Sequence, residues 1–158
     1  MRSKTSEWFT CKVRYEKMME DGLVKKVTEA YVVEALSFTE AEASIAKGMV
    51  PYIHGEFEVA DISRATFKEV MFMGDSGDDN ADTRLYKSKL QFITVDEKTG
   101  KEKRSNVQYL VEGCSLESAR RNIDTVMVGT MIDYVIASVA ETGILGVMEH
   151  EWHGGSEA

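Results

Sequence analysis

The sequence is short of the residues that commonly carry catalysis or metal binding. It contains two cysteines, three histidines and one proline in 158 residues. Cys11 and Cys114 do not occupy equivalent positions in the two halves of the chain. We therefore expect two small buried thiols and no disulfide or redox pair. No serine lies in a nucleophile elbow, and no glycine-rich phosphate loop is present. We therefore expect a non-enzymatic protein that uses no cofactor.

Long apolar runs are missing as well. No stretch approaches the ~20 apolar residues of a membrane span, and the segment 1–8 is not followed by the apolar run of a secretion signal. We expect a cytoplasmic protein without a membrane partner. The net charge of -8 argues against indiscriminate binding of polyanions, although a local basic patch could still bind them.

What the sequence does contain is an internal repeat. With a shift of 78 positions, residues of the first half fall on identical residues of the second, among them Tyr31 on Tyr109 and Ile45 on Ile123. The flanking segments align with a shift of 77. A repeat within a sequence is a stronger indicator of the overall fold than the local propensity for helix or strand. We therefore predict a duplicated structural unit. Because each copy of about 75 residues could only just support its own core, we expect one fused domain over 1–158. Its parts are repeat 1 at 8–73, an acidic linker at 74–84, repeat 2 at 85–149 and a flexible tail at 150–158.

Local patterns predict the elements of the first repeat. Apolar and polar residues alternate over 9–15 and again over 24–36, around the turn dipeptide Asp21-Gly22, which predicts a long hairpin. Ser37 opens a capping box, followed by an apolar stripe typical of a helix. The segment 57–72 alternates loosely, and we interpret it as one long third strand, bent or bulged.

The second repeat predicts the same order. A hairpin over 86–111 and a helix that begins after Ser115 precede the segment 134–148. Taken alone, 134–148 suits a helix, but its match to the first repeat favours a strand. The predicted fold is α+β, with tandem duplicated β-β-α-β units, a mainly antiparallel sheet of six strands, two helices and a pseudo-twofold axis. Such a chain resembles a homodimer fused head to tail.

Basic residues recur on both predicted hairpins. They are Lys12, Arg14, Lys25, Lys26, Lys87, Lys89, Lys101, Lys103 and Arg104. A basic ribbon seen twice could follow the phosphate backbone of a single-stranded nucleic acid, with exposed aromatics stacking on bases. Alternatively, these side chains form a solvated face that prevents aggregation between sheet edges, because glutamates are interleaved with them.

Candidate metal sites are weak. His150 and His153 lie close together with two glutamates, a donor set that a transition metal could use. They lie near the end of the chain without a counterpart in repeat 1, so we expect no metal site there. Asp78, Asn80 and Asp82 have the spacing of a calcium loop, but the required glycine and bidentate glutamate are missing. His54, in a predicted loop between helix and strand, is expected to be a solvated side chain.

Two duplicated glutamates are the remaining polar candidates. Glu34 and Glu112 each lie three residues before a helix-capping serine, where a strand ends. They could face each other and build a central polar site, or they could serve the hairpin edges. A structural role is expected, because both repeats keep them in the same local context.

The pattern Trp8-Phe9-x-Cys11-Lys-x-Arg14, continued by Lys-Val-Thr-Glu-x-Tyr31-x-Val and by Ala-Leu-Ser37-Phe-Thr-Glu, resembles an uncharacterised family of short proteins from gut Bacteroidetes and their phages. The segment Asp133-Tyr-Val-Ile-Ala agrees as well. This family is a domain of unknown function, so the resemblance implies a bacterial or phage cytoplasmic protein and supplies no catalytic residues or ligand.

Two functional hypotheses follow. The first is a binding or regulatory module that engages nucleic acid through the basic hairpins. The second is a protein-interaction or scaffold module, which could be a homo-oligomer that pairs exposed strand edges and could have a phage role such as host or defence interference.

Overall fold

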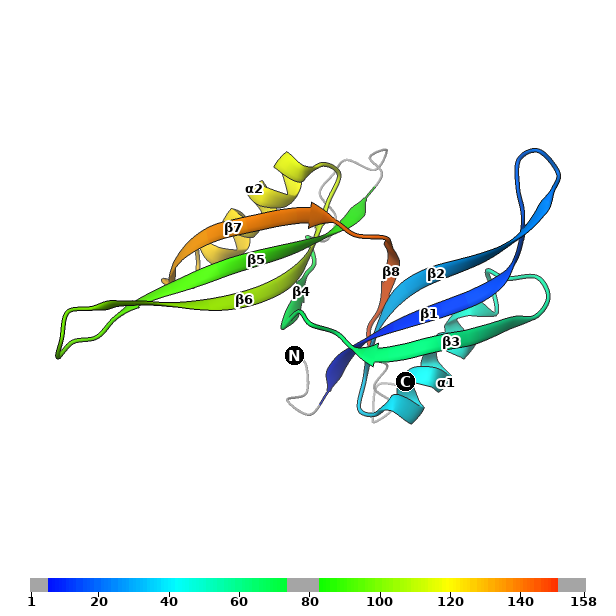
Figure 1. Cartoon of the computed structure of the whole chain (residues 1–158), viewed down its shortest axis with the longest axis horizontal. Helices are drawn as coiled ribbons and strands as arrows, with labels where there is room; N and C mark the ends of the chain where they lie inside the picture. Colours follow the sequence, from blue (N-terminus) through cyan, green and yellow to red (C-terminus); the bar gives the residue numbers. More distant parts are fainter. Residues whose placement is uncertain (1–5, 74–82, 151–158) are drawn as a thin grey trace, which may run out of the picture. The chain divides into compact units, whose positions relative to one another are not determined.

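The computed structural model describes residues 6–73 and 83–150, which form eight strands and two helices (Figure 1). In chain order these elements are β1 (Glu7–Met18), β2 (Val24–Ala35), α1 (Phe38–Met49), β3 (Phe57–Arg64), β4 (Glu69–Met71), β5 (Arg84–Val95), β6 (Glu102–Gly113), α2 (Leu116–Met127), β7 (Asp133–Glu141) and β8 (Ile144–Met148). The predicted α+β class and the two helices are confirmed. The order ββαββ occurs twice.

The chain forms two compact units. Unit 1 contains Met1–Ala65 and Ile144–Ala158, and unit 2 contains Thr66–Gly143. The sheet of unit 1 has the strand order β3-β1-β2-β8, and that of unit 2 has the order β4-β6-β5-β7. Thus β4 belongs to the first repeat in sequence but completes the sheet of unit 2, and β8 belongs to the second repeat but completes the sheet of unit 1.

This strand exchange corrects one prediction. The segment 57–72 was expected to be a single strand, whereas β3 pairs antiparallel with β1 and β4 pairs parallel with β6 in the other sheet. The segment 134–148 divides in the same way, so the prediction of strand in preference to helix is confirmed. The two sheets are mainly antiparallel, as predicted. An alternating pattern shows that a segment is extended but does not say which sheet it joins, and so it could not locate the breaks.

The hairpins form where the sequence predicts them. β1 pairs with β2 over twelve residues without a register shift, and β5 pairs with β6 over twelve residues in the same way. Gly22 and Gly100 lie in the two turns with φ of 85° and 70°, a conformation that favours glycine. Asp21 Oδ1 accepts the N–H of Leu23 at 3.0 Å, which fixes the first turn.

Both helices begin at the predicted serines. Ser37 Oγ accepts the N–H of Glu40 at 3.1 Å, and Ser115 Oγ accepts the N–H of Ser118 at 3.0 Å. Glu40 Oε1 reaches back to the N–H of Leu36 at 2.8 Å, the second bond of a capping box. These bonds satisfy N–H groups that a helix N-terminus leaves without partners.

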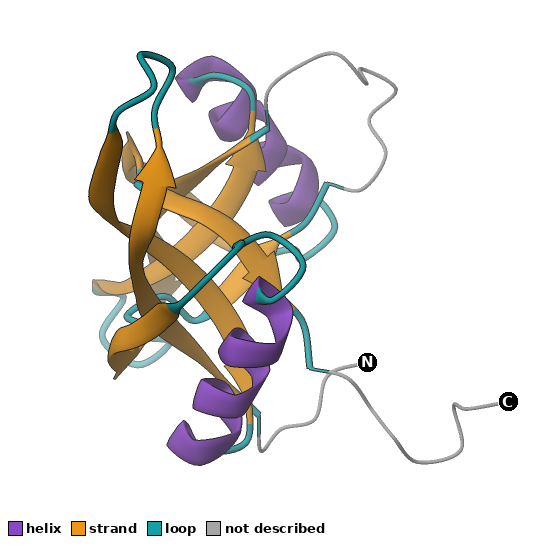
Figure 2. Cartoon of the chain, turned by 90° about the vertical axis from the view of Figure 1, so that its right-hand side faces the viewer, coloured by secondary structure: helices purple, strands orange, loops and turns teal. Residues whose placement is uncertain are grey.

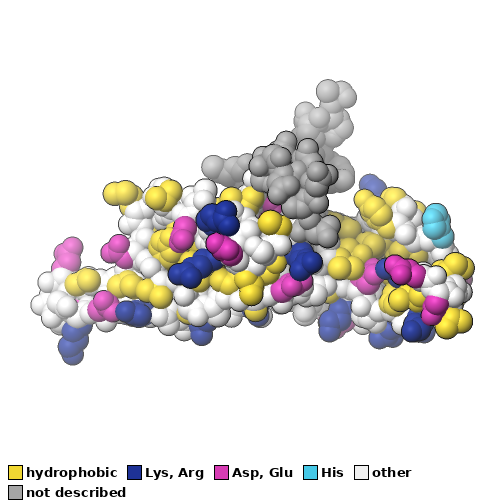
Figure 3. Space-filling model, turned by 90° about the horizontal axis from the view of Figure 1, so that it is seen from above, with side chains coloured by type: hydrophobic (Ala, Val, Ile, Leu, Met, Phe, Trp, Pro, Cys, Tyr) yellow, Lys and Arg dark blue, Asp and Glu magenta, His cyan; other side chains and the backbone are white. Residues whose placement is uncertain are grey.

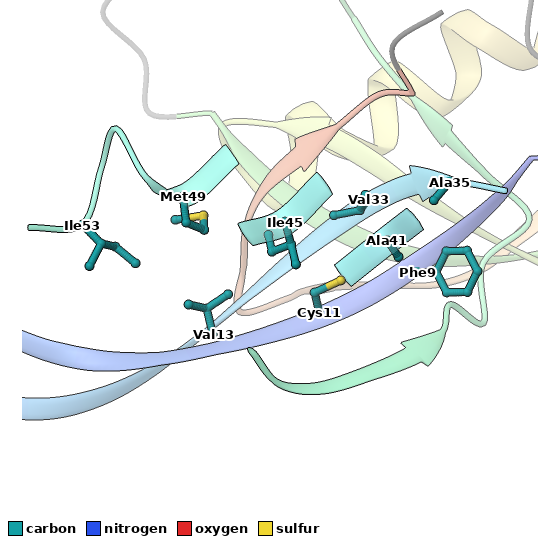
Figure 4. Packing of buried hydrophobic residues seen from close by; sticks show 9 residues of the cluster. All are labelled: Phe9, Cys11, Val13, Val33, Ala35, Ala41, Ile45, Met49 and Ile53. Atoms are coloured by element: carbon teal, nitrogen blue, oxygen red, sulfur yellow. The ribbon is translucent and has the colours of Figure 1, made fainter. Parts of the chain in front are cut away.

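Each helix covers one face of the sheet in its own unit (Figure 2). In unit 1 the buried residues between helix and sheet are Phe9, Cys11, Val13, Val33, Ala35, Ala41, Ile45, Met49 and Ile53 (Figure 4). In unit 2 they are Met71, Tyr86, Leu90, Val111, Ala119, Ile123 and Met127. We call the opposite face of each sheet its helix-free face. Alternation along the strands assigns every strand residue to one face or the other.

The two cysteines differ in environment. Cys11 is fully buried, and this burial, together with the nearby Asp61 carboxylate, raises the pKa of the thiol to about 11. Cys114 is exposed, so the prediction of a second buried thiol is wrong. Its position between the end of β6 and the cap of α2 explains the exposure, because the chain turns at the surface there.

Candidate nucleic-acid interface

A bulge marks the same lysine in both units. The register between β1 and β3 shifts directly after Lys12, and that between β5 and β7 shifts directly after Lys89. Ala60 and Ala137 are the extra residues, and they correspond to each other in the repeat. Both lysines lie on the helix-free face of their sheet. The predicted basic hairpins therefore have equivalent geometry at these positions, and bulges often occur next to functional sites.

In unit 1 the helix-free face mixes cations with acids. Arg14 Nη1 lies 2.9 Å from Glu58 Oε1, on the neighbouring strand β3. Lys12 lies opposite Asp61 in the β1–β3 ladder. Lys26 lies opposite Glu16 in the β1–β2 ladder. The positive charges of this face are thus offset by carboxylates within the same sheet.

In unit 2 the same positions lack the acids. The residues that correspond to Glu16, Glu58 and Asp61 are Ile93, Val135 and Ser138. Lys87 and Lys89 occupy this face of β5, and in the described part of the chain neither forms an ion pair. The helix-free face of unit 2 is therefore the more cationic of the two.

Arg104 adds a third cation to this face. Its Nε lies 3.0 Å from Glu102 Oε2, and its Nη1 donates to Gln91 Oε1 at 3.2 Å. Gln91 in turn donates to Asn106 at 3.3 Å, and Gln108 accepts from Thr66 at 3.0 Å. Amide groups therefore lie beside Arg104 and Lys89 on this face. Together, cations and amides are the donors that proteins direct at phosphate and sugar oxygens.

The other predicted basic residues lie elsewhere. Lys25 is paired with Lys17, and Lys103 with Thr94, on the helix side of their sheets near the hairpin tips. Lys101 precedes β6 in the second turn. The structure therefore brings Lys87, Lys89 and Arg104 together on one face, and Lys12, Arg14 and Lys26 on another.

The predicted base-stacking aromatics are not on the cationic face. Tyr86, Phe92, Tyr109 and Tyr134 all lie on the helix side of the unit 2 sheet, where Phe92 and Tyr109 pack with ring centroids 6.4 Å apart. The strands β4–β7 present only aliphatic and polar side chains on the helix-free face. The arrangement is suited to contacts with a phosphate backbone and not to base stacking.

Unit 1 contains a groove that the sequence did not predict. It has a volume of about 880 Å³ and lies between the β1–β2 hairpin and the loop that joins α1 to β3. Its lining includes Arg14, Tyr15, Lys26, Tyr52 and His54. Figure 3 shows that hydrophobic side chains lie at the surface of the protein between charged side chains. The signal in the sequence was the loop 50–56, where Tyr52 and His54 have no equivalents in repeat 2.

A carboxylate beside this groove receives two tyrosine hydroxyls. Tyr15 and Tyr31 each donate to Glu29 Oε1 at 3.0 Å, and Lys17 Nζ lies 3.6 Å from Glu29 Oε2. Burial, and then the hydrogen bond to Glu29, raise the pKa of Tyr31 above its usual range, and the same two causes raise the pKa of Tyr15. In unit 2 the glutamate is replaced by Val107, so this polar cluster belongs to unit 1 alone.

The duplicated glutamates have a structural role. Glu34 Oε1 accepts the backbone N–H of His150 at 3.1 Å, and its Oε2 accepts Ser6 Oγ at 2.9 Å. Glu112 Oε1 accepts the backbone N–H of Met73 at 2.8 Å. Each carboxylate therefore binds the chain just after an exchanged strand, β8 in unit 1 and β4 in unit 2. This outcome agrees with the expected structural role.

The predicted metal candidates gain no support. His150 Nε2 lies 2.9 Å from Glu40 Oε1, and His153 lies outside the described residues, as do Asp78, Asn80 and Asp82. Within 6–73 and 83–150, no three histidine, cysteine, aspartate or glutamate side chains gather as metal ligands. The described helices include none that is long and apolar enough to cross a membrane.

Comparison with known families assigns the chain. A family model described as Domain of unknown function (DUF4494) matches residues 7–150. The chain belongs to the DUF4494 family. No curated protein matches it. The resemblance to a family of unknown function is thereby confirmed.

The limits of the DUF4494 domain agree with the strand exchange. The match begins at Glu7, the first residue of β1, and ends at His150, the residue whose N–H binds Glu34. Both repeats and both exchanged strands thus lie inside one family domain. A DUF4494 domain is therefore the whole ββαββ pair and not one repeat.

Proposed function

We propose that this protein is a non-enzymatic binding module that contacts the phosphate backbone of single-stranded nucleic acid through the helix-free face of unit 2. The observation that carries the proposal is the loss of acids around Lys87 and Lys89. In unit 1 the equivalent face holds Arg14 paired with Glu58, whereas the corresponding residues in unit 2 are neutral. Two lysines that form no ion pair with the described residues support binding of a polyanion even though the net charge of the chain is -8.

The expected affinity is modest and depends strongly on salt. Three phosphate contacts, from Lys87, Lys89 and Arg104, predict a slope of about -2 for log K against log salt concentration on a single strand. Amide groups of Gln91, Asn106 and Gln108 supply neutral donors to the same backbone. Because the face carries no stacking aromatic, binding should show little preference for base sequence.

Fluorescence anisotropy tests the proposal. A labelled single-stranded 20-mer is titrated with wild-type protein and with Lys87→Gln/Lys89→Gln, at several salt concentrations. We expect the double variant to bind at least tenfold more weakly with a shallower salt slope. The matched control is Lys12→Gln, which changes the equivalent lysine of unit 1 and should bind almost as wild type does. No anisotropy change at the lowest salt, or equal losses in the variant and the control, would reject the proposal.

A second candidate is a protein-interaction or scaffold module. It is favoured by the apolar side chains at the rim of the unit 1 groove, because Met18, Val24 and Tyr52 are 71%, 54% and 75% exposed. Aromatic and methionine side chains beside arginine are typical of the centre of protein interfaces. Capture of a defined partner from a bacterial lysate by wild type, and its loss in Tyr52→Ala, would support this candidate.

The setting of either function is also a proposal. The resemblance to short proteins of gut Bacteroidetes and their phages supports a bacterial or phage origin and a cytoplasmic location. A phage protein of the second class would act by interference with the host or with its defence.

A further inference from the structure

We propose that two copies of the chain pair antiparallel through the outer edges of their β7 strands, joining two unit 2 sheets into one. The pairing itself does not depend on the proposed function. Its consequence for binding, a longer cationic face, does rest on that function.

The first observation is the composition of β7. This strand is the edge of the unit 2 sheet, paired with β5 on one side and with no other described strand on the other. It runs over nine residues, Asp133–Glu141, and no residue between those two ends is charged. Val135, Ala137, Ser138 and Ala140 are all exposed. A long uncharged edge is the kind of strand that pairs with another chain.

The second observation is that the other edges are protected. β3, the equivalent edge of unit 1, carries Glu58, Asp61 and Arg64, and two of these form ion pairs with β1. Charged side chains on an edge oppose pairing with a second chain. The remaining edges are short, since β4 has three residues and β8 has five. Among the described strands, β7 alone is a long edge without internal charge.

Self-complementarity favours a second copy of the same chain. Because Ala137 is an extra residue in the bulge, Asp133, Val135, Ser138 and Ala140 all lie on the helix-free face. An antiparallel register that places Val135 opposite Ser138 of the second copy also places Asp133 opposite Ala140. Facing residues then share one face of the joined sheet, and no two charged residues lie opposite each other. The result is a closed twofold interface with no surface left to propagate.

Such a dimer would enlarge the cationic face. β5, which carries Lys87 and Lys89, lies next to β7 in each copy. Neighbouring strands lie about 4.8 Å apart, so the two β5 strands would be three spacings, or about 14 Å, from each other on one continuous sheet. A single nucleic-acid strand could then contact lysines of both copies.

Sedimentation equilibrium without nucleic acid tests the pairing. Wild type should change from the monomer of 17.7 kDa to twice that mass between about 1 and 200 µM. Ser138→Lys places like charges on the same face across the joint and should weaken the dimer at least fivefold. The matched control is Ser63→Lys on the exposed edge strand β3, which should dimerise as wild type does. A monomer at all concentrations, or equal weakening in variant and control, would overturn the inference.

Cross-linking provides a test of the register. In a Cys114→Ser background, Ala137→Cys should form a disulfide dimer under mild oxidation, because the two copies of this residue lie on either side of the twofold axis, at roughly 6 Å between Cα atoms. Ala60→Cys, at the equivalent bulge of β3, should not. A failure of the first variant to cross-link, or equal yields from both, would argue against β7 pairing.

The outcomes also separate the two proposals. A dimer that binds no nucleic acid would leave the pairing intact and remove the proposed function. A monomer that binds nucleic acid with the predicted salt slope would support the proposed function and reject the pairing of β7 strands.

Discussion

The backbone N–H of His150 donates to the carboxylate of Glu34 at 3.1 Å, between residues 116 positions apart in the sequence. Glu112 makes the equivalent bond to Met73 in unit 2 at 2.8 Å. Both bonds hold the chain directly after an exchanged strand. The glutamates that the repeat duplicates are therefore the residues that secure the exchange.

Removal of Glu34 should destabilise the protein. Its side chain is buried and accepts two hydrogen bonds, so Glu34→Ala should lower the free energy of unfolding by about 2–3 kcal/mol. Urea unfolding gives this value. Glu42→Ala, on the exposed surface of α1, serves as the control and should change it by less than about 0.5 kcal/mol. A loss no larger than that of the control would mean that the two bonds contribute nothing net.

Gly113 should not tolerate a side chain. A Cβ at this buried position would lie 2.8 Å from the backbone nitrogen of Ala119, and a helix backbone cannot move aside as a flexible side chain can. We expect Gly113→Ala to cost about 1–3 kcal/mol in urea unfolding. Gly129→Ala is the control, because no atom lies within 4 Å of its added Cβ. Equal stability of the two variants would contradict the close approach of α2 to β6.

The two thiols should react at very different rates. Cys114 is exposed, whereas Cys11 is fully buried and its pKa is raised to about 11. Since the thiolate is the reactive form, a disulfide reagent at pH 8 should label one thiol per chain quickly and the second only on unfolding. Cys114→Ser should abolish the fast phase. Rapid labelling that persists in this variant would show that Cys11 is accessible.

Stability should fall at alkaline pH through Cys11. The folded state favours the neutral thiol, whereas an unfolded thiol ionises near 9.0. This contribution is therefore complete below pH 9 and is lost as the pH rises towards 11. Urea unfolding at pH 8, 9 and 10 should show a steeper decline in wild type than in Cys11→Ala. Parallel declines would indicate that other groups, such as the tyrosines, account for the alkaline loss.

Glu29 should control the ionisation of its two tyrosines. Its carboxylate accepts both hydroxyls, so its negative charge and hydrogen bonds add to burial in raising the pKa of Tyr15 and of Tyr31. Glu29→Gln should lower both values, which absorbance titration near 295 nm would detect. The control is Asp124→Asn, which should lower the pKa of Tyr134 and leave the other two unchanged. Identical titration curves for wild type and Glu29→Gln would contradict this cluster.

Local signals predicted much of the fold. The turn glycines need a positive φ, the cap serines bind helix N–H groups, and the stripe of Ala41, Ile45 and Met49 faces the core as its spacing predicts. Each of these features depends on residues within a few positions of one another. The helices and hairpins could therefore be predicted from the sequence.

The partners of β4 and β8 could not be predicted in this way. Their apolar patterns fit either sheet, and only the long-range register shows that each joins the other repeat's strands. The sequence also predicted which basic residues recur on the hairpins, but it did not predict which residues lie opposite them on the neighbouring strands. Whether Lys12 faces Asp61, or Lys89 faces Ser138, depends on a bulge that the sequence pattern does not reveal.

The strand exchange has a consequence for the order in which the chain can fold during synthesis. Unit 2 is one continuous segment, 66–143, and all four of its strands can pair as soon as that segment has left the ribosome. Unit 1 starts earlier but needs β8, which is made after the whole of unit 2. The part of the protein that is synthesised first is therefore completed last. Until β8 has been made, the edge of β2 that pairs with it has no partner strand in the sheet of unit 1.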